Sequence, residues 1–189
     1  MQESLSWLQR LELKRAAKTF QKARSESSAK IGGVLFVPPV NATHMNDWLY
    51  PVRDWLQDRP PWPVRVVIGQ QVSTPLHDAI PFVTVEPYTP EQIKRNGSPK
   101  RDLKQHMQRM HVDIAILLEP DIHPTSELLY ALIPARLKAA VWAEGRDRYS
   151  TFLYHPKQRG GLYTHVTSLL EQIELFNGGG LLPAVNKAG

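Results

Sequence analysis

The stretch His111-Val112-Asp113-Ile114-Ala115-Ile116-Leu117-Leu118-Glu119-Pro120-Asp121 decides the fold class. Its apolar residues follow one another from Ile114 to Leu118, without the polar alternation of a half-exposed strand. Such a run indicates a strand that is covered on both faces, as in a parallel sheet. A helical pattern over 124–137 comes next, and a second strand is expected at Lys138-Ala139-Ala140-Val141-Trp142. Together these segments predict a β-α-β unit.

The remainder of the chain repeats this alternation of strands and helices. We expect further strands over 31–37, 64–68, 82–85 and 152–154, and helices over 3–24, 48–56, 101–110 and 162–176. This order predicts an α/β fold, a single Rossmann-like or flavodoxin-like domain with a mainly parallel sheet of about five or six strands between helices. We place the domain over 30–177, after a basic N-terminal helix and linker over 1–29 and before a flexible tail over 178–189.

Composition excludes several classes of protein. The 189 residues include no cysteine, which rules out disulfides, thiolate metal sites and cysteine nucleophiles and favours a reducing cytoplasm. No window approaches the roughly 18 consecutive apolar residues of a membrane span. Charged residues interrupt the segment from Met1 to Phe20, so it lacks the core of a signal peptide. We therefore expect a cytoplasmic protein without a membrane span.

The net charge of +5 is concentrated in two segments. Residues 9–30 contain seven basic and two acidic side chains, and residues 94–109 contain six basic and one acidic, so each segment carries +5 and the rest sums to −5. Basic segments on an acidic body attract polyanions such as RNA, although solvated helix faces have the same composition. The candidate contacts are Arg10, Lys14, Arg15, Lys18, Lys22, Lys94, Arg95, Lys100, Arg101 and Lys104.

A ligand pocket in such a fold would lie beyond the carboxyl ends of the strands. Polar residues follow the expected strand 31–37 at Asn41, Thr43 and His44. Others follow the apolar run 114–118 at Glu119, Asp121 and His123. Carboxylates and imidazoles can carry protons or bind metals, but the same residues commonly cap helices and face solvent. These six residues are therefore the candidate lining of a pocket, without an assigned catalytic role.

Motifs for known cofactors are missing from the sequence. The chain after the first strand reads Pro38-Pro39-Val40 instead of the glycines that bring backbone amides to a phosphate, so neither a dinucleotide fingerprint nor a P-loop is present. The histidines show no zinc spacing, and no nucleophile elbow occurs. We expect no cofactor, no metal site and no catalytic residue, and the sequence favours a protein that is not an enzyme.

Most large aromatic residues fall within apolar patterns, which indicates that their side chains pack in the core. This applies to Trp48, Trp55, Trp62, Tyr130 and Trp142. Trp7 lies beside the basic residues of the first helix and could instead anchor that helix on RNA, lipid or protein. Whether this helix docks on the domain or on a partner stays open at this point.

Several segments read together resemble known families. The chain resembles a family of short uncharacterised Bacteroidota proteins. The resemblance is carried by the basic leading helix, the strand 30–37, the turn 94–98, the strand 112–118 and the alanine-leucine pattern ending at Ala139. A shorter stretch is similar to the acceptor-side half of heptosyltransferase-type glycosyltransferases, over residues 113–116, 128–131 and 135–139. In those enzymes a second Rossmann-like domain holds most of the donor nucleotide. The second resemblance therefore implies a fold without the catalytic half.

Three hypotheses for function follow. The first is a non-catalytic cytoplasmic protein that binds an anionic partner, RNA or a ribonucleoprotein, through the two basic segments. The second is a sugar or nucleotide site at the strand ends, as a remnant of a glycosyltransferase-like domain. The third is an assembly or membrane-surface protein that contacts a protein partner or lipid through its first helix.

Overall fold

The computed structural model of the chain describes residues 6–26, 33–40, 45–57, 62–70, 76–80, 83–156 and 160–176. One sheet of six strands runs through them in the order β3-β2-β1-β4-β5-β6, and every neighbouring pair is parallel. The strands are β1 (Val34–Val37), β2 (Val64–Gly69), β3 (Val83–Tyr88), β4 (Val112–Leu117), β5 (Ala135–Val141) and β6 (Phe152–Tyr154). The predicted Rossmann-like α/β class is confirmed.

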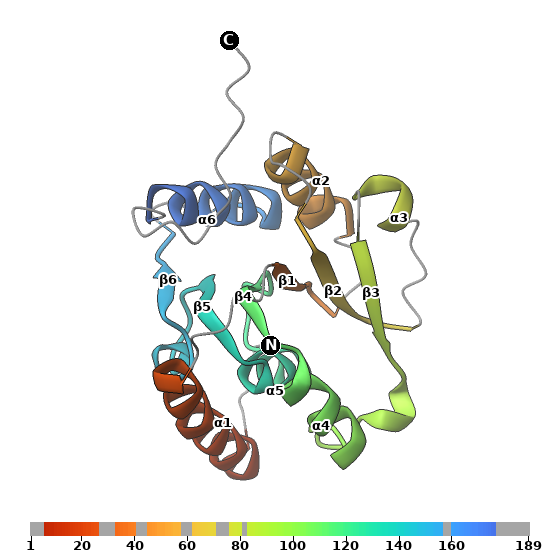
Figure 1. Cartoon of the computed structure of the whole chain (residues 1–189), viewed down its shortest axis with the longest axis vertical. Coiled ribbons are helices and arrows are strands. Elements are labelled where there is room, and N and C mark those ends of the chain that lie inside the picture. The colour runs from red at the N-terminus through yellow and green to blue at the C-terminus, as the bar shows by residue number, and fades with distance from the viewer. Residues whose placement is uncertain are drawn as a thin grey trace.

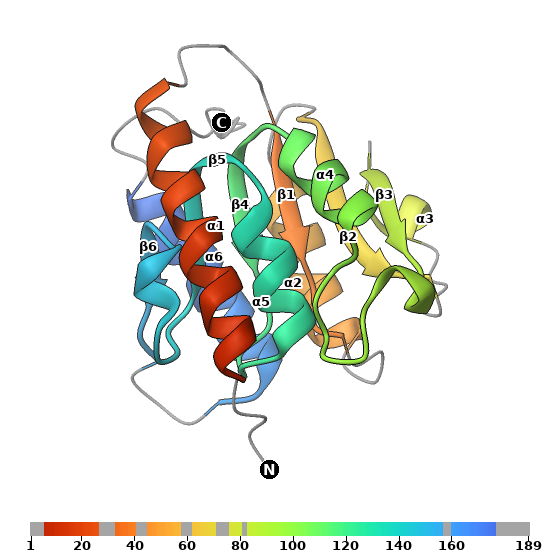
Figure 2. The same ribbon diagram turned by 90° about the horizontal axis from the view of Figure 1, so that it is seen from below.

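Helices cover both faces of the sheet (Figure 1). One layer consists of α2 (Met45–Gln57), the short α3 (Leu76–Ala79) and α6 (Leu162–Phe176). The other layer consists of α1 (Trp7–Glu26), α4 (Arg101–Arg109) and α5 (Pro124–Leu132), with α5 between the other two in Figure 2. Two single 3-10 turns, η2 (Pro90–Gln92) and η3 (Arg146–Arg148), lie in the connections.

Successive side chains of the central strands supply two separate cores. Val34 and Phe36 of β1 join the core under α2 and α6, whereas Leu35 and Val37 join the core under α1, α4 and α5. This division follows from the strand geometry, in which neighbouring side chains point to opposite faces. Because both faces are covered, all four residues are buried, as the unbroken apolar runs predict.

The helix predicted over 124–137 is too long. It ends at Leu132, and β5 begins at Ala135 instead of Lys138. Pro134 explains the difference, because a proline disfavours the helical conformation of the residue before it; Ile133 is extended, with ψ of 122°. The alanine-leucine pattern of 135–139, which fits a helix by spacing, is therefore part of a strand.

The polar segment after β3 forms the predicted turn. Ile93 and Pro99 form an antiparallel bridge, and Gly97 donates a backbone hydrogen bond to the Lys94 carbonyl at 2.8 Å. Gly97 has a φ of +77°, which favours glycine. The start of β3 was expected near residue 82, and the strand continues to Tyr88 through Pro87, which an edge strand tolerates.

The first helix docks on the domain. Four buried residues recur at helical spacing along it: Gln9, Leu13, Ala16 and Ala17. The three apolar ones belong to the core under α1, α4 and α5. Trp7 remains 71% exposed. Among the helices that the structure describes, none is both long and apolar enough to cross a bilayer. The proposed domain boundaries stay a prediction, and the tail 178–189 lies outside the described residues.

Candidate functional site

The strand order places a topological switch point between β1 and β4. From β1 the chain proceeds through β2 to β3 on one side, and from β4 it proceeds through β5 to β6 on the other. In open α/β sheets the loops at the carboxyl ends of such strands diverge and leave a crevice for ligands. Here these loops are the segment after Val37 and the segment 118–123. Both had been predicted as the lining of a pocket.

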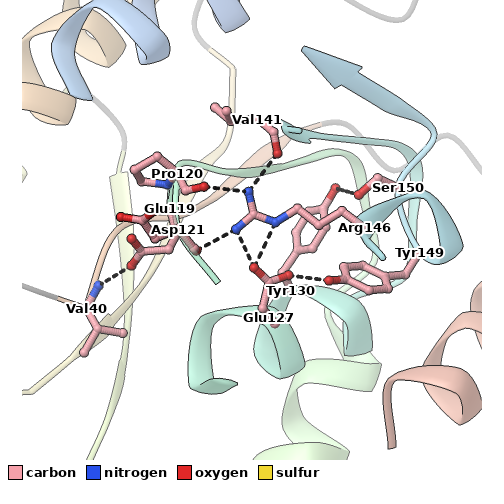
Figure 3. Close-up of polar contacts among 10 residues, drawn as sticks. All are labelled: Val40, Glu119, Pro120, Asp121, Glu127, Tyr130, Val141, Arg146, Tyr149 and Ser150. Atoms are coloured by element: carbon pink, nitrogen blue, oxygen red, sulfur yellow. Dashed lines mark hydrogen bonds and ion pairs between the residues drawn. The ribbon is translucent and has the colours of Figure 1, made fainter. Parts of the chain in front are cut away.

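Glu119 connects the two loops of the switch point. Its Oε2 accepts a hydrogen bond from the Val40 backbone N–H at 3.2 Å (Figure 3). Burial raises the pKa of this carboxyl, and the nearby carboxylates of Asp121 and Glu127 act in the same direction. The Val40 N–H and the Arg146 guanidinium oppose that rise. A carboxyl in this position keeps its proton to a higher pH than an exposed glutamate does.

Two of the other predicted pocket residues, Asp121 and His123, lie in the same loop as Glu119, and the Asp121 carboxylate is near enough to raise the pKa of Glu119. Asp121 is exposed, and its backbone oxygen accepts a hydrogen bond from Arg146 Nη2 at 2.8 Å. His123 is the N-cap residue of α5, and its carbonyl accepts from the Glu127 N–H at 3.0 Å. Asn41, Thr43 and His44 lie outside the described residues. Within the described ranges no group of three histidine, cysteine, aspartate or glutamate side chains could hold a metal ion.

A small cavity lies at the carboxyl ends of β1, β2 and β3, against α5. Its volume of about 10 Å³ is enough for roughly one water molecule. Its lining includes Pro38, Pro39, Val40, Gly69, Tyr88 and Ser126. The Ser126 hydroxyl is buried and has no hydrogen-bond partner among the described residues. Burial and the Glu119 carboxylate raise the pKa of Tyr88 to about 12, so its phenol stays protonated at neutral pH.

The loop after β4 rests on a buried ionic network that the sequence analysis missed. Arg146, which is fully buried, donates from Nε to Glu127 Oε1 at 2.9 Å and also contacts that oxygen through Nη2 (Figure 3). It further donates to the carbonyls of Asp121 at 2.8 Å and Val141 at 2.7 Å. The Tyr149 hydroxyl donates to the second Glu127 oxygen. One guanidinium thus fixes the loop after β4 and the end of β5.

The clue to this network was one charged residue in an apolar helix. Glu127 is the single charged residue in the α5 sequence Pro-Thr-Ser-Glu-Leu-Leu-Tyr-Ala-Leu. A carboxylate inside such a pattern needs a buried partner, because an unpaired buried charge is costly. Nothing in the sequence points to Arg146 as that partner, since it lies in the polar run Glu144-Gly145-Arg146-Asp147-Arg148 and resembles a surface turn.

A second buried cation lies at the other end of α5. Lys138 donates from Nζ to the carbonyls of Tyr130 at 2.6 Å and Ala131 at 3.1 Å, in the last helical turn. Its Nζ also lies 4.5 Å from the centre of the Tyr130 ring. These carbonyls carry the negative end of the helix dipole and stabilise a cation. Burial nevertheless lowers the pKa of Lys138 to about 7.

The structure brings the two basic segments together. Gln9 of α1 donates from Nε2 to the Asn96 carbonyl, and Lys104 Nζ of α4 lies 2.9 Å from Glu12 Oε1 of α1. The turn between them also contacts α5, where Thr125 Oγ1 donates to the Gly97 carbonyl at 3.2 Å. The two contacts between α1 and the second segment join residues that are 87 and 92 positions apart in sequence. In Figure 2, α1 and α4 lie in the same layer on either side of α5.

Most of the predicted basic contacts are exposed on this layer. We call the following residues the basic face: Arg10, Lys14, Arg15, Lys94, Arg95, Lys100 and Arg101, all exposed to solvent. Lys104 is half-buried and paired with Glu12, which leaves it less available to a partner. Lys18 and Lys22 belong to α1, but their side chains lie outside the described residues. Asp102 is an exposed acidic residue within the second segment, and the exposed Glu91 lies just before that segment.

Comparison with known proteins identifies the fold and no family. No family model and no curated protein matches the chain. Among solved structures, the chain is similar to the E. coli heptosyltransferase WaaC with ADP, with a TM-score of 0.59 and 13% sequence identity. The match covers 82% of this chain and 49% of that one, so the chain spans about half the length of the heptosyltransferase. At this identity the likeness shows a shared fold alone, and the Bacteroidota resemblance stays a prediction.

Proposed function

We propose that the protein is a non-catalytic cytoplasmic α/β protein that binds an anionic macromolecule, RNA or a ribonucleoprotein, through the basic face. The observation that carries this proposal is the junction of the two basic segments by Gln9–Asn96 and Lys104–Glu12. Two separate charged segments would each bind a polyanion weakly. Joined in one layer, on either side of α5, they offer several cations to a single polyanion at once, and each phosphate contact releases counterions.

The proposal predicts binding that depends on salt and on both segments. The probe is a single-stranded polyuridine oligonucleotide, measured by fluorescence anisotropy with the full chain. The affinity should fall by at least tenfold as salt rises from about 50 to about 200 mM. Reversal of Lys14 and Arg15 to glutamate, and separately of Lys100 and Arg101, should each weaken binding and reduce the salt slope.

The matched control changes exposed residues of α2, which covers the opposite face of the sheet (Figure 1). Arg53, Asn46 and Gln57 are exposed there. The triple variant Arg53→Glu, Asn46→Asp and Gln57→Glu changes the net charge by the same amount and should reduce affinity much less. Equal losses from this variant and from the reversals on the basic face would mean that net charge alone attracts the RNA. Binding that stays flat over the salt range would contradict the proposal.

A second candidate function is the binding of a sugar or nucleotide at the switch point. It is supported by the likeness to an ADP-bound heptosyltransferase and by two polar groups beside the crevice, the Glu119 carboxyl and the buried Ser126 hydroxyl. The cavity there has room for about one water molecule, so a sugar or nucleotide would lie outside it, in the crevice at the strand ends. Thermal unfolding with ADP, and with neutral monosaccharides, tests this candidate, because a ligand that binds the folded chain raises the unfolding temperature with the logarithm of its concentration once that exceeds the Kd.

Variants distinguish a switch-point ligand from adventitious stabilisation. Glu119→Gln and Ser126→Ala are nearly isosteric, and each should remove most of the ligand-dependent increase in unfolding temperature. The same increase in both variants and in the native chain would exclude the switch point as the site.

A further inference from the structure

An open groove lies at the edge of the sheet, between β6 and α6. Its volume of about 460 Å³ is within the range of roughly 300–1,000 Å³ that is usual for small-molecule sites. β6 is the last strand of the sheet, and β5 separates it from β4 and the switch point. α6, which lines the groove, covers one face of the sheet, whereas α1 and α4, which carry basic-face residues, cover the other (Figure 1). The groove is therefore separate from both sites considered above.

One wall of the groove is a polar stripe of α6. The lining residues of this helix recur at helical spacing: Thr164, His165, Ser168, Glu171 and Gln172. The apolar stripe of the same helix, Val166, Leu169, Leu170 and Ile173, is buried against the sheet. The side chains of Thr164, Ser168, Glu171 and Gln172 make no hydrogen bond or ion pair with any described residue. They leave donors and acceptors available to a ligand.

The other wall is aromatic and comes from β6. Phe152, Tyr154 and His155 line it. The His155 ring stacks on Trp142, with ring centres 5.2 Å apart and an interplanar angle of 28°. Trp142 was expected in the core but is 48% exposed, because it follows the last residue of β5 and lies beyond the sheet. Its backbone N–H donates to the Tyr154 carbonyl at 2.7 Å, which fixes this tryptophan beside the groove.

The lining combines ring faces with hydroxyl, amide and carboxylate groups. Aromatic rings pack against the apolar C–H face of a sugar ring, while neighbouring polar side chains pair with its hydroxyls. No lysine or arginine occurs among the described lining residues, and Glu171 repels anions. We propose that this groove binds an uncharged sugar, a pyranose ring held between the aromatic wall of β6 and the polar stripe of α6.

Titration of the full-length, isotope-labelled chain with neutral methyl glycosides tests the proposal by NMR. The probes are the methyl glycosides of glucose, mannose and galactose, each at up to about 50 mM, since a shallow open site implies millimolar affinity. At least one probe should shift the backbone amides of residues 152–155 and 164–172, with smaller shifts elsewhere. Glucose 6-phosphate should bind more weakly than the neutral glycosides. Stronger binding of the phosphorylated sugar would overturn the proposed ligand class.

Two variants separate binding from folding. Gln172→Ala removes exposed hydrogen-bonding groups and should weaken binding about three- to tenfold. Ser168→Phe fills the groove and should abolish the shifts, while the circular dichroism spectrum stays native. Gln105→Ala, at an exposed position of α4, is the matched control and should leave the affinity unchanged.

The results also reveal other occupants of the groove. If no glycoside shifts these amides, or if Ser168→Phe leaves the shifts intact, the proposal is wrong. If the same amides shift with protein concentration alone and the chain elutes as a dimer, a second copy occupies the edge of β6, which equally overturns it. None of these outcomes affects the proposals for RNA or for the switch point.

Discussion

The two faces of the sheet are stabilised by different kinds of contact. The core under α2 and α6 consists of buried apolar side chains such as Val34, Phe36 and Leu169. On the α1, α4 and α5 face, the apolar core surrounds buried charges, namely Glu127, Arg146 and Lys138. Apolar contacts tolerate many partners, whereas a buried charge requires partners at defined distances and directions. The face under α2 and α6 therefore accepts many apolar side chains of suitable size. The buried charges of the α1, α4 and α5 face instead fix the positions of the loops that they contact.

The largest expected effect comes from breaking the ionic network on the charged face. Arg146→Ala leaves Glu127 buried with the Tyr149 hydroxyl as its remaining side-chain donor, and should lower the free energy of unfolding by about 3–5 kcal/mol. Urea denaturation measures this change. The control is Arg148→Ala, which alters an exposed arginine two residues away and should change stability by less than about 0.5 kcal/mol.

A double variant shows whether the loss is due to an unpaired charge. Replacing both partners, as Arg146→Met with Glu127→Leu, removes the pair without leaving either charge behind. It should be clearly more stable than Arg146→Ala alone. If it is equally unstable, the carbonyl contacts of Arg146 are the larger contribution.

A cavity on the apolar face should cost somewhat less. Leu169 of α6 is fully buried, and Leu169→Ala should lower the free energy of unfolding by about 3 kcal/mol. Because Leu169 carries no charge and packs among buried apolar side chains, the loss should be nearly the same at pH 6 and pH 9 when measured by urea denaturation. A loss that changes strongly with pH would show that the two faces are energetically coupled.

The pH dependence of stability distinguishes the charged face from the apolar one. Lys138 has a pKa of about 7 in the folded chain and an ordinary value of 10.5, so between these values the unfolded chain binds more protons. Stability should therefore rise with pH from about 7 to 10, and change little below pH 7 through this residue. In Lys138→Met this rise should be absent. A rise of the same size in the variant would assign it to another group.

The smallest effect is expected at the junction of the two basic segments. Gly97→Ala would place a Cβ 3.0 Å from Pro124 Cβ at a φ of +77°, and should cost about 1–2 kcal/mol. Gly145→Ala is a matched control, because Gly145 has a φ of +87° but no atom within 4 Å of the added Cβ. The difference between the two variants in thermal unfolding isolates the close approach of the turn to α5.

Several features of the molecule could be predicted because they depend on local pattern. The unbroken apolar run at Ile114–Leu118 requires two covered faces, and the helix over 162–176 follows from its apolar spacing. The helix after β4 was extended too far, because the spacing of Ala135, Leu137 and Ala139 satisfies both a helix and a buried strand. Periodicity cannot separate these alternatives over so few residues.

The sequence by itself determined the α/β class, the parallel sheet and the presence of two basic segments, since hydrophobic pattern and charge are properties of neighbouring residues. The tertiary structure decided which distant residues meet: Arg146 with Glu127, Lys104 with Glu12, and Trp142 with His155. Such pairs depend on the crossing of strands and helices far apart in the chain, which no local pattern encodes. The proposed RNA surface and the proposed sugar groove both rest on contacts of this second kind.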